Sequence, residues 1–179
     1  FLSKYPCIGK IANYVYCVWV DNRDGNKEIY CNHSINGGVS WYSESRITNN
    51  AGNSQFPSIT GSGPNLTVVW QDDRDGSGNV EIYYNTSINT GVYWGSERRL
   101  TNNQYISEYP SVVASGNTIH VVWTDTRDNA ISGEIYYKKS PDNCVSWGSD
   151  TKLSNAGTFT IYPSVVVSGT NVFVDWQDV

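Results

Sequence analysis

The sequence contains no methionine among its 179 residues, so its first residue, Phe1, is not a native start. This absence predicts either that a leader has been removed or that the chain is a piece of a longer product. Positive charge is also scarce, because 12 Lys and Arg oppose 17 Asp and Glu to give a net charge of −5. A phosphate-binding surface needs a concentrated basic face, so this balance argues against nucleic acid as a partner.

Two kinds of long pattern are missing as well. No stretch approaches the roughly 18 consecutive apolar residues of a membrane span, so we expect no membrane-spanning segment. No segment shows the 3.6-residue period of an amphipathic helix. Because both patterns are absent, we expect a chain that lies outside the membrane and is built of strands.

Cysteine is sparse. The four cysteines, Cys7, Cys17, Cys31 and Cys144, fit no C-x-x-C metal spacing. Cys7 and Cys17 flank a predicted hairpin turn around Ala12–Asn13, which makes a cross-strand disulfide between them a candidate. The alternative is four small, semi-buried thiols.

Three N-x-S/T triplets bear on the compartment. They begin at Asn32, Asn65 and Asn85 and would accept glycans in a eukaryotic secretory route. Such triplets also arise by chance in an Asn-rich chain. We favour a secreted, extracellular protein.

The strongest positive signal is a sequence that repeats itself about every fifty residues. A W-x-D motif recurs at intervals of 51, 53 and 53 residues, and a proline and a second tryptophan follow the same spacing. Such a period is typical of an array in which each unit buries its apolar face on its neighbours. We expect one array over residues 1–179, with repeats at about 5–55, 56–108 and 109–161 and a partial repeat at 162–179. The repeated residues are Trp19, Trp70, Trp123 and Trp176; Pro6, Pro57, Pro110 and Pro163; and Trp41, Trp94 and Trp147.

The third repeat predicts four short antiparallel strands. Apolar or β-branched runs over 109–114, 118–123 and 134–139 are separated by turn signals, and an alternating run follows over 147–153. Four such strands in about fifty residues make a propeller blade. The predicted fold class is an all-β propeller of four-stranded antiparallel blades, of which the chain holds about three and a half. Its end flanks would need burial by self-association or by the remainder of a longer propeller chain.

Charged residues two apart mark the fourth strand of each repeat, and they share one face of that strand. We expect them to discourage edge-to-edge pairing with other chains, which is a structural role. These pairs are Glu44 and Arg46, Glu97 and Arg99, and Asp150 and Lys152.

The turn before each second tryptophan resembles the Asp box, S-x-D-x-G-x-x-W, of the bacterial neuraminidase repeat found in sialidases and related six- or seven-bladed propellers. A short Asx side chain caps such a turn, glycine allows positive φ, and tryptophan anchors the hairpin. Asn replaces Asp in the first two copies and Cys144 replaces Gly in the third. The resemblance implies a structural role on the face opposite the active site. The matching residues are Ser34, Asn36, Gly38 and Trp41; Ser87, Asn89, Gly91 and Trp94; and Ser140, Asp142 and Trp147.

A second repeated stretch, W-x-D-x-R-D, supplies the candidate ligand-binding residues. The sialidase resemblance implies that this loop opens on the ligand-binding face, where a similarly placed Arg and Asp in one early blade bind the substrate carboxylate and act as general acid/base. The structural alternative is an Arg–Asp pair that pins the loop in each blade, and the near-identity of the copies favours it. The three triplets are Asp21, Arg23 and Asp24; Asp72, Arg74 and Asp75; and Asp125, Arg127 and Asp128.

Other chemistry is weakly signalled. The stretches Asp21–Gly25 and Asp73–Gly76 are similar to a calcium loop, but aligning them on the glycine puts Val20 or Gln71 at the first ligand position. We therefore expect no cofactor and no metal, with calcium as the alternative. The family's F-R-I-P-like stretch is absent, and no Tyr or Glu is unique enough to nominate as catalytic.

Three functions remain open. The first is a non-catalytic sialidase-like propeller that acts as an extracellular binding module, with glycans as the candidate partners, or as a scaffold. The second is an exo-sialidase-type glycoside hydrolase of which this chain is only part. The third is a structural or assembly repeat protein. The uniformity of the repeats favours the first and third.

Overall fold

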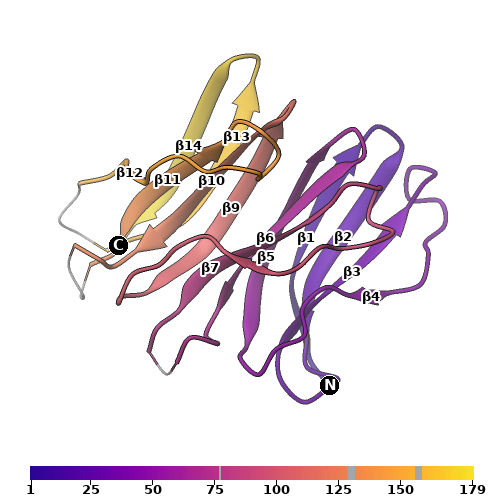
Figure 1. Cartoon of the computed structure of the whole chain (residues 1–179), viewed down its shortest axis with the longest axis horizontal. Helices are drawn as coiled ribbons and strands as arrows, with labels where there is room; N and C mark the ends of the chain where they lie inside the picture. The colour runs from indigo at the N-terminus through magenta and orange to yellow at the C-terminus, as the bar shows by residue number, and fades with distance from the viewer. Residues whose placement is uncertain (77, 129–131, 156–158) are drawn as a thin grey trace.

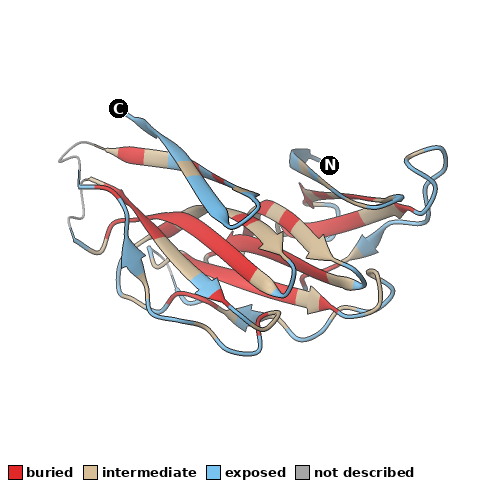
Figure 2. Cartoon of the chain, turned by 90° about the horizontal axis from the view of Figure 1, so that it is seen from above, coloured by how far each residue is buried: buried red, intermediate tan, exposed pale blue. Residues whose placement is uncertain are grey.

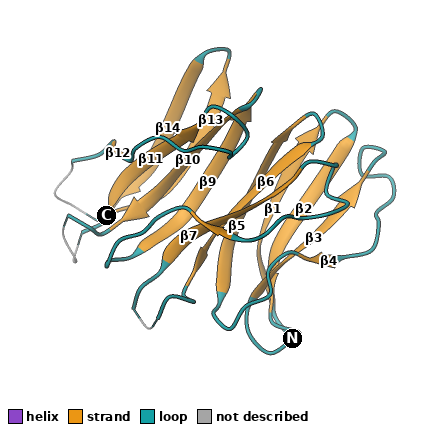
Figure 3. Cartoon of the chain, in the orientation of Figure 1, coloured by secondary structure: helices purple, strands orange, loops and turns teal. Residues whose placement is uncertain are grey.

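The computed structural model describes residues 1–76, 78–128, 132–155 and 159–179, and these residues form strands and turns with no helix (Figure 3). Within that part of the chain, accordingly, no helix is long and apolar enough to cross a membrane. The strands are β1 (Ser3–Ile11), β2 (Tyr14–Asp21), β3 (Glu28–Ser34), β4 (Ser45–Arg46), β5 (Ser54–Ser62), β6 (Asn65–Asp72), β7 (Glu81–Ser87), β8 (Arg98–Arg99), β9 (Ser107–Ser115), β10 (Thr118–Asp125), β11 (Glu134–Ser140), β12 (Thr151–Lys152), β13 (Thr160–Ser168) and β14 (Asn171–Asp178).

The strands form three four-stranded antiparallel sheets and one two-stranded sheet, which confirms the predicted three and a half blades. We name the sheets blade 1 (β1–β4), blade 2 (β5–β8), blade 3 (β9–β12) and blade 4 (β13–β14). They stand side by side in chain order (Figure 1). Strands β1, β5, β9 and β13 contact one another and form the inner edge of the array. The fourth strands are shorter than predicted, since β12 covers only Thr151–Lys152.

The core lies between the blades. Successive residues of a strand face opposite sides, so Val68 packs towards blade 1 and Val69 towards blade 3. Trp70 and Trp123 are completely buried in the two interblade cores. A smaller core joins Val122 and other residues of blade 3 to blade 4. Figure 2 shows the buried residues concentrated in the middle of the array, with β14 largely exposed.

The two outer faces of the array, on blade 1 and blade 4, are exposed to solvent. Ile8 on β1 is 68% exposed, whereas its repeat equivalents Ile59, Val112 and Val165 are 5%, 6% and 5% exposed. On blade 4, Phe173 is 54% exposed. These side chains are exposed because blade 1 has no blade before it and blade 4 has none after it.

The candidate disulfide between Cys7 and Cys17 is wrong for this structure, in which all four cysteines are free. Cys7 lies opposite Val18, and Cys17 lies opposite Ile8. Opposed residues share a face and adjacent residues do not, so the two thiols point to opposite faces of blade 1. A bulge between Lys4 and Cys7 contributes to this register.

One of the three glycosylation triplets is not a usable acceptor. Asn85 is 1% exposed, and its side-chain amide donates to the Gly95 carbonyl at 2.9 Å. A glycan there would require the blade to open. Asn32 and Asn65 are partly exposed.

Replacing Trp70 with alanine should destabilise the protein by about 3–5 kcal/mol, because it empties a fully buried interblade site. Trp19→Ala is the matched control, since Trp19 occupies the same repeat position on the open flank of blade 1 and should cost less. Chemical denaturation measures both free energies of unfolding. Equal losses would contradict the open flank and show that blade 1 is covered in solution.

Candidate functional site

The W-x-D aspartates of blades 1 to 3 are buried anchors rather than exposed ligands. Asp178, their equivalent in blade 4, is exposed. In blade 2 the Trp70 indole donates to Asp72 at 2.8 Å, and Ser54 on the inner strand donates to the same carboxylate at 2.7 Å. Blade 3 repeats this with Trp123 and Asp125, also at 2.8 Å. Each aspartate thus ties its own strand to the inner strand of the blade.

The arginine of each triplet folds back on that aspartate. Arg74 donates to both oxygens of Asp72, at 2.8 and 2.6 Å, a bidentate pair that fixes the planar guanidinium. The guanidinium carbon also lies 4.2 Å from the centroid of the Tyr83 ring. Arg127 has equivalent contacts to Asp125 and Tyr136.

A second carboxylate also binds each triplet arginine. Arg23 binds Glu44 and Arg127 binds Asp150, both at 2.6 Å, while Arg74 binds Glu97. The acidic residues predicted to protect the fourth-strand edge therefore hold the triplet loops. Their role is structural, as predicted, and they hold loops. Glu97 also accepts from the Asn49 backbone N–H, in the connection from blade 1 to blade 2, at 2.9 Å.

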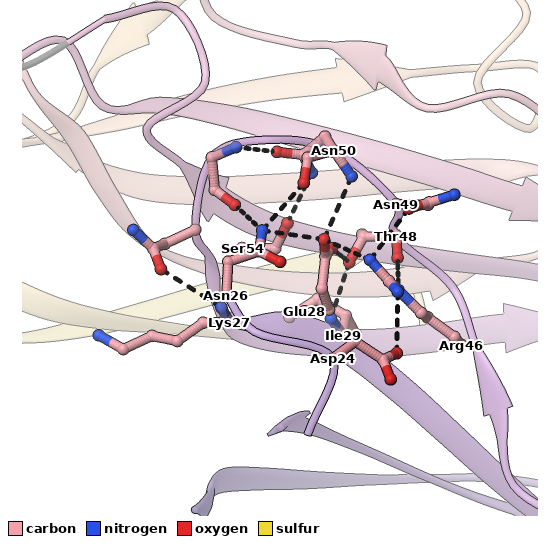
Figure 4. A network of polar contacts seen from close by, with 12 residues as sticks. Asp24, Asn26, Lys27, Glu28, Ile29, Arg46, Thr48, Asn49, Asn50 and Ser54 are labelled. Carbon is pink, nitrogen blue, oxygen red and sulfur yellow. Dashed lines mark hydrogen bonds and ion pairs between the residues drawn. The ribbon is translucent and has the colours of Figure 1, made fainter. Parts of the chain in front are cut away.

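The last aspartate of each triplet joins a second network in the same blade. Asp24 accepts from the Tyr30 hydroxyl. It also accepts from Arg46 at 2.8 Å (Figure 4). Arg46 also binds buried Glu28 at 2.7 Å, and Thr48 donates to that glutamate at 2.5 Å. Blade 2 uses Asp75, Arg99 and Glu81 in the same way, and blade 3 uses Asp128, Lys152 and Glu134.

The contacts set the protonation of these groups. Hydrogen bonds from Arg23 lower the pKa of Asp21. Burial would raise the pKa of Asp72, but hydrogen bonds from Arg74, Ser54 and Trp70 outweigh it and lower that pKa. The Tyr30 hydroxyl lowers the pKa of Asp24, while burial and then the bond to Asp24 raise the pKa of Tyr30 to about 12.

The triplets stay in their own blades with one partial exception. A polar hollow of about 670 Å³ brings Asp75 of blade 2 and Arg127 of blade 3 to a common wall, lined also by Asn102, Asn103 and Tyr105. Within the described ranges, no three His, Cys, Asp or Glu residues are grouped to hold a metal ion.

The Asp-box turns lie at the opposite ends of the blades, because Ser34 pairs with Val15 while Glu28 pairs with Asp21. In each box the Asx oxygen accepts a backbone N–H four residues on, at 2.8–3.0 Å. Cys144 adopts a φ of 67°, so it takes the backbone conformation that Gly91 has in blade 2. Trp94 and Trp147 pack on the core shared with the preceding blade, and Trp41, which has no such blade, is 44% exposed.

Sequence reasoning missed an aromatic cluster on the inner strands. Tyr5, Phe56, Tyr109 and Tyr162 form what we call the axial aromatic row. Ring centroids are 4.0 Å apart between Tyr5 and Phe56, 4.9 Å between Phe56 and Tyr109, and 4.4 Å between Tyr109 and Tyr162. The row lies at the same blade ends as the triplets, since Ser3 pairs with Asp21. An aromatic residue directly before each repeated proline was the available signal.

Solved structures identify the fold. No family model matches the chain, and no curated protein sequence matches it. Trypanosoma rangeli sialidase in complex with the inhibitor DANA matches 98% of this chain and 34% of its own, with a TM-score of 0.69 and 11% identity. Leech intramolecular trans-sialidase matches 99% and 47%, with a TM-score of 0.74 and 7% identity. Penicillium chrysogenum α-L-arabinanase complexed with arabinobiose matches 92% and 59%, with a TM-score of 0.67 and 18% identity.

The chain thus has the sialidase-like β-propeller fold and spans less than two thirds of each of these proteins. At these identities the likeness establishes the fold alone, so any argument about function has to rest on the residues described above.

The ion-paired aspartates should make the protein acid-sensitive. The native pKa values of Asp21, Asp24, Asp72 and Asp128 lie below the unfolded value of about 3.9. Their contribution to stability is complete above that value and is lost as pH falls through the native pKa values. We expect the melting temperature to fall steadily below about pH 4, and the fall to be shallower in Asp72→Asn. Circular dichroism melts between pH 6 and 2 test this, and a flat profile would refute it.

Proposed function

We propose that this protein is a non-catalytic propeller that serves as an extracellular binding or scaffold module, with glycans as its candidate ligands. The observation that carries the proposal is the engagement of the triplet arginines in ion pairs. Arg23, Arg74 and Arg127 each hold two carboxylates of their own blade. A guanidinium already engaged in this way would have to break those ion pairs before it took the carboxylate of a sialic acid.

The protonation of the triplets supports the same proposal. A glycoside hydrolase needs one carboxyl group with a raised pKa as general acid and a second as nucleophile or base. The resolved shifts in the triplets lower the aspartate pKa values in all three blades. One network repeated in three blades fits the stabilisation of loops better than a reaction at one centre.

The second candidate is an exo-sialidase-type hydrolase of which this chain is only part. Glu108 favours it, because burial raises the pKa of this carboxyl next to Tyr109 on the inner strand. The solved structures with a similar fold are themselves sialidases and an arabinanase, of which the chain spans only a part. Residues outside this chain would then supply the remaining groups. A purely structural or assembly role is the third candidate.

The proposed cover for the open flank of blade 1 is another blade of the same repeat, supplied by self-association or by the remainder of a longer propeller chain. Ile8 and Trp41 support this, because their repeat equivalents in blades 2 and 3 pack against a preceding blade. We propose an extracellular location on the glycan-acceptor triplets at Asn32 and Asn65.

The proposal predicts no turnover of a fluorogenic sialoside and binding to at least one glycan class on an array. Turnover that disappears when Asp24, Asp75 and Asp128 are replaced by Asn would refute the non-catalytic reading. An array without hits would favour the scaffold over the binding module. Melting curves of the variants provide the control for folding.

A further inference from the structure

We propose that the axial aromatic row is a binding platform for a neutral saccharide, whose ring stacks on the exposed faces of the aromatic side chains. This inference rests on the proposed binding function and names its site and ligand class. The row and the prolines that follow its members line a hollow of about 220 Å³ at the inner edge of the array. Tyr5 and Tyr162, at the two ends of the row, are 42% and 52% exposed.

The chemistry of the lining selects the ligand. The described lining residues are Tyr5, Phe56, Tyr109, Tyr162 and four prolines, and none of them is charged. Such a surface offers no cationic partner for the carboxylate of a sialic acid or for a phosphate. The aromatic faces carry partial negative charge, which complements the partly positive C–H groups on the apolar face of a sugar ring. Ligand sites generally combine such aromatic walls with a few polar groups.

The backbone holds the platform in place. Tyr5, Phe56, Tyr109 and Tyr162 have φ between 51° and 54°, a left-handed conformation that bulky residues rarely adopt. Each lies in a register shift of its inner strand, where the following proline leaves no ladder N–H unpaired. Bulges of this kind redirect side chains and are frequent beside functional sites. The rings are therefore preorganised, which lowers the entropic cost of binding.

The residues that directly precede the four aromatic residues differ between blades. They are Lys4, Gln55, Glu108 and Ile161, of which the first three are polar. Gln55 accepts from Lys27 at 2.8 Å. Glu108 is half-buried and lies beside the lining of the hollow rather than in it. Its carboxylate has neither a hydrogen-bond nor an ion-pair partner in the described part of the chain, so it is available to sugar hydroxyls. This difference between blades gives the platform a means of orienting a ligand that the repeated triplets lack.

Calorimetric titration with lactose, cellotetraose, arabinotriose and 3′-sialyllactose tests the inference. We expect a neutral oligosaccharide to bind, and Tyr109→Ala to weaken it about tenfold. Tyr109→Phe should retain the affinity, because stacking needs the ring and Phe56 already occupies the equivalent position. Tyr93→Ala is the matched control, since Tyr93 is 75% exposed on an Asp-box turn at the opposite blade ends. Tyr162→Ala is a second variant at a less packed position, should Tyr109→Ala fail to fold.

The outcomes separate the two proposals. Neutral-sugar binding that survives Tyr109→Ala and Tyr162→Ala would overturn the axial site and leave the binding function standing. Binding of 3′-sialyllactose alone would overturn the ligand class. Failure of every saccharide to bind would overturn this inference, and a glycan array with hits for other structures would show that the binding function survives it.

Discussion

The constraint on which this structure depends is that a blade has two apolar faces and buries both only when a neighbour lies on each side. Val68 and Val69 are adjacent on β6, yet they pack into different interblade cores and are both fully buried. Ile8 is 68% exposed and its repeat equivalent Ile59 is 5% exposed, which shows how much apolar surface a missing neighbouring blade leaves in contact with water. Burial of such flanks stabilises the array by about 25 cal/mol per Å² of apolar surface removed from water. This coupling between nearest neighbours explains why one module is repeated with few changes.

The buried polar residues at the blade ends are subject to a second constraint, which is that each must find hydrogen-bond and charge partners. The inner strand and the loop after the second strand must be joined where the apolar core ends, and buried Asp72 does so through Trp70, Ser54 and Arg74. Buried carboxylates are tolerated only when their hydrogen bonds and charges are satisfied. The acidic residues at the fourth strands pair with the triplet arginines and so balance the remaining charge. The same residues that suggested a binding loop in the sequence are therefore largely engaged in ion pairs within the fold, and the aromatic row is the surface that we propose for a ligand.

The repeat period made the fold predictable, including the number of blades and the capped turn at Asn36 and its equivalents. Which charges meet was not predictable, because the pairing of Arg23 with Glu44 depends on how two loops approach each other. The disulfide prediction failed because a bulge and the alternation of faces separate Cys7 from Cys17. The aromatic row was missed because a left-handed φ at Tyr5 or Phe56 follows from a bulge that propensities do not reveal. The repeated dipeptide of an aromatic residue and proline was visible in the sequence, but only the structure shows that the four aromatic side chains lie together.

Hydrogen exchange resolved by strand tests the central claim of neighbour-dependent burial most directly, because amide protection reports local opening. The account predicts the slowest exchange in β6 and β10, whose blades have neighbours on both sides, and much faster exchange in β14, whose outer face is exposed. Protection of β14 equal to that of β10 would contradict the account, because it would mean that blade 4 is stable without a second neighbour or is covered in solution.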